Sequence, residues 1–518
     1  MNKVFEVRTA DGVLLSTQVE TPDGSGPWPV IVARTPYSKA GMARGLSGMV
    51  QRGYAVAVQD VRGTGESGGV FAFLKQEVPD AIDTGRWILE QSFCDGNLGL
   101  LGISYLAAAS LGIALSFPEN VKAAVWVAPV LGGRSLFHVD GALRLHHNLP
   151  WTALSHPRFR ELDWRSIYRY LPLNDALDSV GIDSPLWRSI CEDRDRIWAE
   201  NDFAEVYHSL NVPGLHFGGF WDFMLDSSLF AWEASARPGA KPQALFLGPW
   251  SHNGMASEAT KNEYADYGPG ASSAFSARVL QWFDHHLKGQ ELCSDLATPV
   301  SAYVPGPGWV RMSAWPDPAA LPYDLYLGAG SLEPEPGEAG RLSYVYDPSD
   351  PVPTEGGALW EFPRAGLNPG PAPVTTGNRD DVLVFQGRGL REPVVALGPA
   401  QVDLYVETDA PSTDFTAKLV DVGIDGTPRI VADSICRITG PGRVQVIIRL
   451  LGIGHVFDKG HRIRLDVSSS NFPRFDRNLN TGVPGLVSSQ MKVARQTVQF
   501  GPDSPSRVRL NLLCSYNP

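Results

Sequence analysis

Four short runs rich in Val, Ile and Leu dominate the first 133 residues, and helical patterns separate them. The runs are WPVIVARTPY (28–37), YAVAVQDVRG (54–63), NLGLLGIS (97–104) and VKAAVWVAPV (121–130). Strands that are continuously apolar belong to a sheet buried on both faces, and a helix usually connects parallel neighbours. The pattern therefore predicts a parallel sheet with intervening helices, one of them over residues 78–91.

The same alternation returns after an interruption. Residues 134–210 are rich in Trp, Arg and Asp, with helical spacing and no convincing strand. A further strand, helix and strand follow at VPGLHFGG (212–219), around 227–235, and at QALFLGPW (243–250). The simplest interpretation is one α/β domain over 1–133 and 211–300, into which a helical segment over 134–210 is inserted.

Beyond about residue 300 the helical patterns disappear. A Pro/Gly-rich stretch over 333–377 is typical of loops, and strands of period two follow at QVDLYVET (401–408), HRIRLDVSS (461–469) and RVRLNLL (507–513). In the last of these, Val508, Leu510 and Leu512 face one way. Many such strands separated by turn residues predict a third domain over 301–518, a β-sandwich of the jelly-roll type.

Charge and composition exclude several classes of partner. The chain of 518 residues carries a net charge of -12 and no basic run, so neither nucleic acid nor an anionic membrane is expected as a partner. No apolar stretch reaches the roughly 18 residues of a membrane span. The N-terminus lacks a secretion signal, so a cytoplasmic protein is expected, and a homo-oligomer is possible. Five scattered cysteines indicate neither a disulfide framework nor a zinc site.

The stretch GLLGISYLAAASLGIAL (99–115) places Ser104 between an apolar strand and a helix of small residues. One interpretation is a helix N-cap, because a serine oxygen accepts hydrogen bonds from the free N–H groups there. The other is a nucleophile elbow, in which a tight strand-to-helix turn exposes the hydroxyl. The second interpretation requires a base and an acid elsewhere in the chain.

A serine hydroxyl is a weak nucleophile until a histidine accepts its proton, and a carboxylate must orient that histidine. Asp222 in LHFGGFWDFM follows one predicted strand, and His252 in LFLGPWSHNG follows the next. The alternatives are a helix N-cap for Asp222 and a loop histidine for His252. Asp226 and His216 compete, but the pattern places Asp226 inside a helix and His216 inside a strand.

The negative oxygen of a tetrahedral intermediate needs hydrogen-bond donors. The residue after the nucleophile supplies its backbone N–H, here from Tyr105. The loop after the first long strand, ARTPYSK, carries Tyr37, whose phenol is a candidate second donor. The alternative for Tyr37 is a side chain packed against a proline turn.

No cofactor or metal is expected. GTGESG (63–68) matches G-x-G-x-x-G, but Gly69 and VFAFL follow it rather than a helix. The adjacent pairs His146–His147 and His285–His286 diverge by about 100° on a helix and do not make a metal site. Four tryptophans of the helical segment are predicted to be core, with one or two available to line a pocket: Trp151, Trp164, Trp187 and Trp198.

Five spaced motifs, RTPYSK, DVRGTGESGG, GISYLAAAS, GGFWD and GPWSH, resemble the cocaine esterase and X-prolyl dipeptidyl-peptidase family. That family includes α-amino-acid ester hydrolases and glutaryl cephalosporin acylases. YDPSDPVPTEGG (346–357) and GHRIRLDVSSSNFPRFDRN (460–478) are similar to its C-terminal domain. The resemblance implies an α/β-hydrolase fold with an inserted helical cap and a C-terminal jelly roll, with the pocket where these parts meet.

The resemblance also assigns roles. It implies Ser104 as nucleophile, Asp222 as acid, His252 as base, and an oxyanion hole formed by the Tyr37 hydroxyl and the Tyr105 N–H. The motif departs from G-x-S-x-G because Leu106 replaces the last glycine, although the small Ala107 follows. The expected activity is hydrolysis of a small-molecule carboxylic ester or amide through an acyl-enzyme.

Two other functions remain open. One is an X-prolyl dipeptidyl aminopeptidase, which must pair the free amine of its substrate with carboxylates that the sequence does not identify. The other is a non-catalytic module that binds a carbohydrate or a partner.

Overall fold

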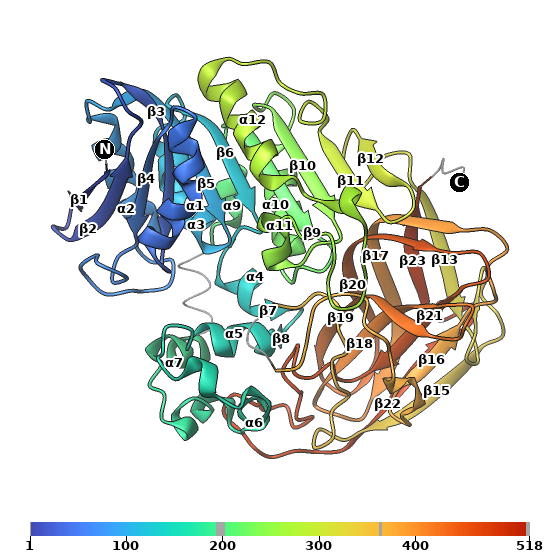
Figure 1. Cartoon of the computed structure of the whole chain (residues 1–518). Coiled ribbons are helices and arrows are strands. Elements are labelled where there is room, and N and C mark those ends of the chain that lie inside the picture. The colour runs from blue at the N-terminus through green and yellow to red at the C-terminus, as the bar shows by residue number, and fades with distance from the viewer. Residues whose placement is uncertain (1, 193–201, 362–364, 514–518) are drawn as a thin grey trace.

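A computed structural model describes residues 2–192, 202–361 and 365–513 of the chain (Figure 1). Its N-terminal part contains a ten-stranded sheet in the order β1-β2-β4-β3-β5-β6-β9-β10-β11-β12. The strands are β1 (Asn2–Arg8), β2 (Leu14–Glu20), β3 (Trp28–Thr35), β4 (Ala55–Asp60), β5 (Cys94–Ile103), β6 (Val121–Val127), β9 (Gly214–Gly219), β10 (Gln243–Gly248), β11 (Val300–Val304) and β12 (Gly308–Met312). Those from β4 to β11 run parallel, which confirms the predicted parallel sheet.

Helices cover both faces of this sheet. They are α1 (Lys39–Gln51), α2 (Glu77–Leu89), α3 (Tyr105–Ser116), α10 (Leu225–Ser235), α11 (His252–Ala256) and α12 (Phe275–Lys288). On one face of β5, a Cβ at Gly99 would lie 2.9 Å from Phe283 and 3.0 Å from Leu287 of α12. Gly102, an odd number of residues later, faces α3 on the other side. The small residues of β5 therefore let two helix layers approach the sheet closely.

The segment after β6 is mainly helical, as predicted. Its helices are α4 (Gly133–Phe137), α5 (Leu145–Trp151), α6 (Trp164–Arg169), α7 (Pro185–Glu192) and α9 (Ala204–Tyr207). In Figure 1, α5, α6 and α7 lie at lower left, apart from the main sheet. Trp164 and Trp187 are buried in the core, whereas Trp198 lies outside the described residues.

One detail of this segment differs from the prediction. The expectation of no strand is wrong, because β7 (His138–Val139) pairs with β8 (Ala142–Leu143) in a small hairpin. The hairpin is held from the C-terminal part of the chain: Asp476 Oδ1 accepts a hydrogen bond from the Leu143 N–H at 2.7 Å. Two residues per strand are too few for any periodicity to show in the sequence.

The C-terminal part is an antiparallel β-sandwich, which confirms the predicted jelly-roll architecture. One sheet contains β14 (Leu332–Glu333), β13 (Leu321–Leu327), β23 (Arg507–Leu512), β17 (Val394–Thr408), β22 (Ala494–Phe500) and β15 (Gly340–Tyr346), with β20 (Gly442–Phe457) also paired to β17. The other contains β16 (Leu383–Gln386), β21 (Arg462–Ser468), β18 (Ser412–Val422) and β19 (Pro428–Thr439). Val402 and Leu404 of the first sheet share one apolar core with Phe415 and Leu419 of the second.

The prediction of loops over 333–377 is partly wrong, because β15 lies within that range. Tyr344 and Tyr346 are buried on one face of β15, while Ser343 and Val345 are exposed on the other. The strand pairs along its whole length with β22, about 150 residues further along the chain. The surrounding prolines and glycines hide this short alternation in the sequence.

No helix in the described ranges combines the length and apolar character needed to cross a bilayer. Among the described residues, Cys94, Cys191, Cys293 and Cys436 form no disulfide, and Cys514 lies outside these residues.

Candidate active site

Ser104 forms the turn between β5 and α3. Its backbone has φ 55° and ψ -120°, a region that costs a residue with a Cβ about 1–3 kcal/mol. Its side chain makes no capping hydrogen bond to α3, so the N-cap interpretation is wrong. The Ser104 N–H donates to the Val127 carbonyl at 2.8 Å, which fixes the turn to β6 and leaves the hydroxyl free of any structural bond within the described residues.

The tightness of this turn explains the local sequence. A Cβ at position 102 would lie 2.5 Å from the Cα of Ala107, a distance that real Cβ atoms do not show. The turn therefore needs glycine at 102 and a small residue at 107. Leu106, which replaces the last glycine of G-x-S-x-G, is buried in the core and does not obstruct the turn.

Asp222 and His252 lie on neighbouring loops that follow β9 and β10. Backbone hydrogen bonds join the two loops, from the Trp221 N–H to the Trp250 carbonyl at 3.0 Å and from the Phe220 N–H to the Gly248 carbonyl at 2.8 Å. His252 Nδ1 lies 3.0 Å from Asp222 Oδ1. The structure thus brings together two residues that the sequence places 30 positions apart.

The environment of His252 favours its protonated form. Burial lowers the pKa of His252, but the Asp222 carboxylate and, more weakly, the Glu361 carboxylate outweigh it, so the pKa is raised above its usual value of 6.5. A carboxylate only accepts, so Nδ1 carries the proton of this hydrogen bond. In the neutral imidazole, Nε2 is then an unprotonated acceptor, as a general base requires.

Asp222 is fully buried and has a second role. Its Oδ1 also accepts a hydrogen bond from the Met224 N–H at 3.0 Å, but Met224 rather than Asp222 is the N-cap of α10, so the N-cap interpretation of Asp222 is wrong. Its Oδ2 has no hydrogen-bond partner among the described residues. One oxygen of this carboxylate therefore holds both the turn and the imidazole.

The competing residues are engaged elsewhere. Asp226 lies in α10, where its Oδ2 accepts a hydrogen bond from Arg144 Nη2 at 2.7 Å. His216 is fully buried in β9 beside Gln243 Oε1 at 2.9 Å, and burial lowers its pKa to about 4. Neither contacts the Asp222–His252 pair through a hydrogen bond.

Tyr37 follows β3, and its hydroxyl accepts a hydrogen bond from Trp151 Nε1 at 3.4 Å. The residue as a whole is 51% exposed, yet burial around the hydroxyl raises the pKa of Tyr37 above its usual value. Its phenol is therefore neutral near pH 7 and retains a proton to donate. The contact with Trp151 also places that tryptophan at the site rather than wholly in the core.

Tyr105 is the first residue of α3, so its N–H has no acceptor within the helix. Its side chain is engaged in the core, where the hydroxyl donates to Glu77 Oε1 at 2.8 Å and accepts from the Leu74 N–H at 3.2 Å. The side chain thereby anchors the first turn of α3 and leaves the backbone N–H available.

The Phe223 ring, which the sequence did not identify, lies beside His252 and joins a cluster of aromatic rings. The Phe223 ring lies 5.1 Å from the His252 ring and 4.3 Å from the His147 ring, and Trp360 lies 5.1 Å from His147. Phe223 is adjacent to Asp222, which is a local signal. Trp360 lies in the Pro/Gly-rich stretch of the C-terminal part, where no motif marks it.

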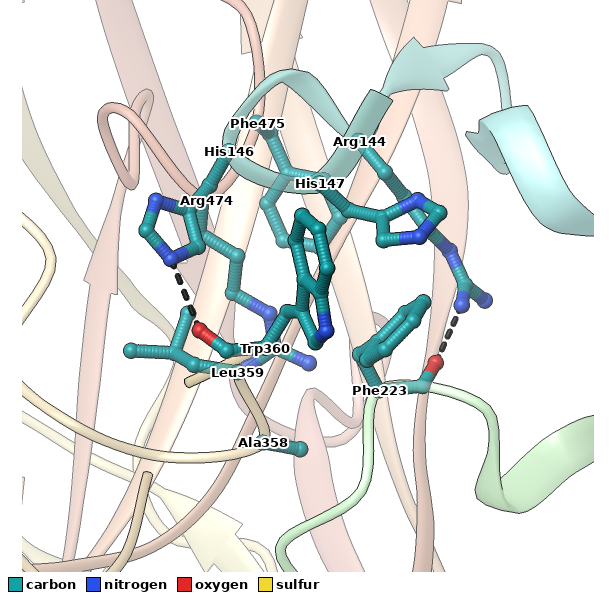
Figure 2. Close-up of a pocket in the computed structure, with 9 residues that line it drawn as sticks. All are labelled: Arg144, His146, His147, Phe223, Ala358, Leu359, Trp360, Arg474 and Phe475. Atoms are coloured by element: carbon teal, nitrogen blue, oxygen red, sulfur yellow. Dashed lines mark hydrogen bonds between the residues drawn. The ribbon is translucent and has the colours of Figure 1, made fainter. Parts of the chain in front are cut away.

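These three rings are among the residues that line a small cavity, shown as sticks in Figure 2. The cavity has a volume of about 20 Å³, room for roughly one water molecule. His146 Nε2 lies 3.0 Å from the Trp360 carbonyl and must donate to it. Burial lowers the pKa of His146 to about 4, so this imidazole is neutral. This hydrogen bond therefore connects the helical segment to the loop that carries Trp360, at the edge of the site.

Among the described residues, no group of three His, Cys, Asp or Glu side chains has an arrangement that could hold a metal ion.

Comparison with known proteins identifies relatives along almost the whole chain. A family model described as X-Pro dipeptidyl-peptidase (S15 family) matches residues 11–254, and one for the X-Pro dipeptidyl-peptidase C-terminal non-catalytic domain matches 294–509. Cocaine esterase of Rhodococcus sp. (strain MB1 Bresler) is 32% identical, over 97% of this chain and 97% of its own length.

Solved structures share the architecture. An α-amino acid ester hydrolase has a TM-score of 0.87 at 25% identity, over 99% of this chain and 96% of that one. An aminopeptidase from a marine sediment Thaumarchaeota archaeon has the same fold, with a TM-score of 0.86 at 23% identity, over 99% of this chain and 96% of its own. The chain therefore belongs to the cocaine esterase and X-Pro dipeptidyl-peptidase family of serine hydrolases.

Proposed function

We propose that this chain hydrolyses carboxylic esters through an acyl-enzyme formed on Ser104. The observation that carries the proposal is the Asp222–His252 contact of 3.0 Å, made by the loops that follow two adjacent parallel strands. Support comes from the strained turn at Ser104 and from its free hydroxyl. The names of two relatives, cocaine esterase and α-amino acid ester hydrolase, also favour an ester substrate.

In the first half-reaction, Ser104 Oγ attacks the ester carbonyl carbon while His252 Nε2 accepts the serine proton. Asp222 holds the imidazole in the tautomer with Nδ1 protonated and stabilises the imidazolium that forms. The carbon–oxygen bond to the alcohol then breaks, and the imidazolium protonates the departing alcohol. In the second half-reaction, a water molecule repeats the attack on the acyl-enzyme and releases the acid.

The tetrahedral intermediates carry a negative oxygen. We infer that the Tyr37 hydroxyl and the Tyr105 N–H donate to it. Trp151 supports this role, because its N–H occupies a lone pair of the Tyr37 oxygen and leaves the phenolic proton free to point elsewhere. Most of the transition-state stabilisation in acyl transfer comes from donors of this kind, since they are oriented before charge develops.

We also infer the domain boundaries of the chain. Residues 1–133 and 211–300 form the catalytic domain, 134–210 the inserted cap and 301–518 the C-terminal jelly roll. Because β11 and β12 pair within the catalytic sheet up to Met312, we shift the boundary between the catalytic domain and the jelly roll from residue 300 to residue 312.

The second candidate is an X-prolyl dipeptidyl aminopeptidase, favoured by the description of the matching family model. A panel of p-nitrophenyl esters and aminoacyl-prolyl anilides separates the two functions. We expect hydrolysis of the esters, whereas turnover restricted to the anilides would favour the peptidase.

A fluorophosphonate probe tests the proposed chemistry directly, because it reacts with an activated serine. We expect stoichiometric labelling of the wild-type protein, with the adduct on Ser104 by peptide mass spectrometry. Ser104→Ala should lose the labelling and about 10⁶-fold in kcat while retaining its melting temperature. Labelling at another serine, or near-wild-type turnover by Ser104→Ala, would contradict the assignment, and no labelling of the wild type would favour a binding module.

A further inference from the structure

Arg144 reaches from the helical segment to the loop that carries Asp222. It is 5% exposed. Its Nη1 donates a hydrogen bond to the Phe223 carbonyl (Figure 2), and its Nη2 donates to Asp226 Oδ2 at 2.7 Å. One guanidinium therefore holds both the residue after Asp222 and the first turn of α10. None of the catalytic steps described above uses this arginine.

The stability of α5 does not explain why an arginine occupies this position. Arg144 is the N-cap of α5, where its N–H donates to the Phe137 carbonyl at 2.8 Å and its carbonyl accepts from the Asn148 N–H at 3.0 Å. A cation at a helix N-terminus faces the positive end of the helix dipole, and a buried cation has lost its hydration. The contacts that compensate for this burial are those with the Asp222 loop and α10.

A single peptide unit connects Arg144 to the proposed catalytic acid. The C=O of this unit belongs to Phe223 and accepts from Arg144. Its N–H belongs to Met224 and donates to Asp222 Oδ1 at 3.0 Å. The same oxygen lies 3.0 Å from His252 Nδ1. A hydrogen bond at the carbonyl polarises a peptide unit and strengthens donation by its N–H, so the guanidinium and the imidazole are joined by one line of hydrogen bonds.

We propose that Arg144 is a positioning residue, which holds the Asp222 carboxylate against His252 by fixing the next peptide unit of the loop. The inference rests on the proposed esterase function and adds a residue of the helical segment to its machinery. An arginine suits this task because its two terminal nitrogens serve different acceptors: one holds the peptide, and the other pairs with the carboxylate of Asp226.

The charges around His252 make the pH profile informative. Burial lowers the pKa of His252, and the carboxylates of Asp222 and Glu361 outweigh it. The neighbouring His147 is neutral, because burial and, to a smaller degree, nearby charges that include Arg144 lower its pKa. Loss of the Arg144 cation by itself would raise the pKa of His252, whereas a displaced Asp222 would lower it. The sign of the change therefore distinguishes an electrostatic effect from a loss of positioning.

Arg144→Met removes the guanidinium and keeps an unbranched side chain. We expect kcat for a p-nitrophenyl ester to fall by about 10–100-fold, the range for a lost hydrogen bond to a charged group, while KM stays within about threefold. The midpoint of kcat/KM against pH should fall by about half a unit or more relative to the wild type. A midpoint that rises, or one that does not move, would overturn the proposal.

A double-mutant cycle tests whether the effect passes through Asp222. A protein that already carries Asp222→Ala has no carboxylate to position, so adding Arg144→Met should lower the remaining kcat by less than about threefold. An undiminished 10–100-fold loss in that background would show that Arg144 acts elsewhere and would contradict the proposal.

Arg477→Met is the matched control. Arg477 is a buried arginine that also donates to backbone carbonyls, of Arg169 in the helical segment at 2.6 Å and of Pro348 in the jelly roll at 3.3 Å. The loops of Asp222 and His252 take no part in these hydrogen bonds. We expect the melting temperature to fall while kcat and the pH midpoint stay as in the wild type. Equal changes of kcat and midpoint in the two variants would reduce Arg144 to a structural role.

Arg144→Lys is measured alongside, because Arg144→Met could fail to fold. A single ammonium cannot donate to the Phe223 carbonyl and the Asp226 carboxylate at once, and opposite charge favours the carboxylate. We therefore expect kcat and the pH midpoint to fall in this variant too, although the positive charge is kept. Wild-type values of both in Arg144→Lys would overturn the proposal.

Two measurements keep such an outcome apart from a failure of the esterase proposal. They are fluorophosphonate labelling of the wild type at Ser104 and the loss of kcat in Asp222→Asn. Both persist if only the role of Arg144 is wrong, and neither is observed if the chain is not a serine hydrolase of the proposed kind.

Discussion

Asp222 beside His252 and Asp414 in the jelly roll are both fully buried aspartates, but their surroundings differ. Asp414 accepts hydrogen bonds at both oxygens, from Arg437 Nε at 2.7 Å, Arg437 Nη2 at 2.8 Å and Asn478 Nδ2 at 2.9 Å. Asp222 uses only Oδ1, and its Oδ2 has no partner among the described residues.

The difference distinguishes a buried carboxylate that stabilises the fold from buried carboxylates at the candidate active site. Arg437 bridges Asp414 and Asp476, and this saturated network joins β18, β19 and the β7–β8 hairpin. Such a network is costly to break, since a lone buried charge remains. The two carboxylates that act on His252 instead keep unused acceptors, at Asp222 Oδ2 and Glu361 Oε2. Four predictions test whether this distinction holds.

The largest effect is expected from Asp222→Asn, which keeps the shape of the side chain but favours the wrong imidazole tautomer. We expect kcat to fall by about 10⁴-fold, with little change in melting temperature. Asp226→Asn is the control, and its kcat should fall far less because Asp226 pairs with Arg144 instead. Steady-state kinetics on a p-nitrophenyl ester measures both, and the reverse ranking would show that Asp226 is the acid.

Arg437→Met should have the opposite effect to Asp222→Asn, a loss of stability with little loss of activity. Removing the guanidinium leaves Asp414 and Asp476 buried without a cation, so we expect the free energy of unfolding to fall by about 3–5 kcal/mol. Chemical denaturation followed by tryptophan fluorescence measures this loss, and kcat of the folded fraction should stay within about threefold of wild type. A large loss of kcat without a loss of stability would remove the distinction between the two aspartates.

Tyr37→Phe probes the oxyanion donor. Loss of one donor typically reduces kcat by about 10²–10³-fold, or roughly 3–4 kcal/mol, while KM changes much less because the oxygen carries its charge mainly in the transition state. The ring and its packing remain, so stability should barely change. If more than about half of kcat survives when acylation limits the rate, Tyr37 is a packing residue.

The smallest effect concerns pH. Neutral His252 is the active form, so kcat/KM for a neutral ester should rise with pH through a midpoint above 6.5, because Asp222 and Glu361 outweigh burial and raise the pKa of His252. The free energy of unfolding should depend on pH in the opposite sense to kcat/KM. The contribution that protonated His252 makes to it is fully present below the unfolded-state pKa and is lost as pH rises through the folded-state pKa. The midpoint should move down in Glu361→Gln and stay unchanged in Arg437→Met. A midpoint unmoved by Glu361→Gln would contradict the stated electrostatics.

Much of the architecture could be predicted because it depends on local patterns. Continuous apolar runs marked the strands β3, β4, β5 and β6, and alternation marked β23. The short hairpin β7–β8 and the strand β15 were missed, since two residues show no period and prolines and glycines surround β15. Pairing with β22, far along the chain, is what makes β15 a strand.

The sequence by itself determined the order of the parts and the positions of Ser104, Asp222 and His252 at the ends of predicted strands. Those positions follow from hydrophobic periodicity and turn residues, which act over a few neighbours. Only the tertiary structure decided that Asp222 rather than Asp226 reaches His252, that Trp151 touches Tyr37, and that Glu361 accepts from Asn253 across 108 residues of chain. Contacts between distant segments depend on how whole domains pack, and no local pattern encodes the direction in which a side chain then points.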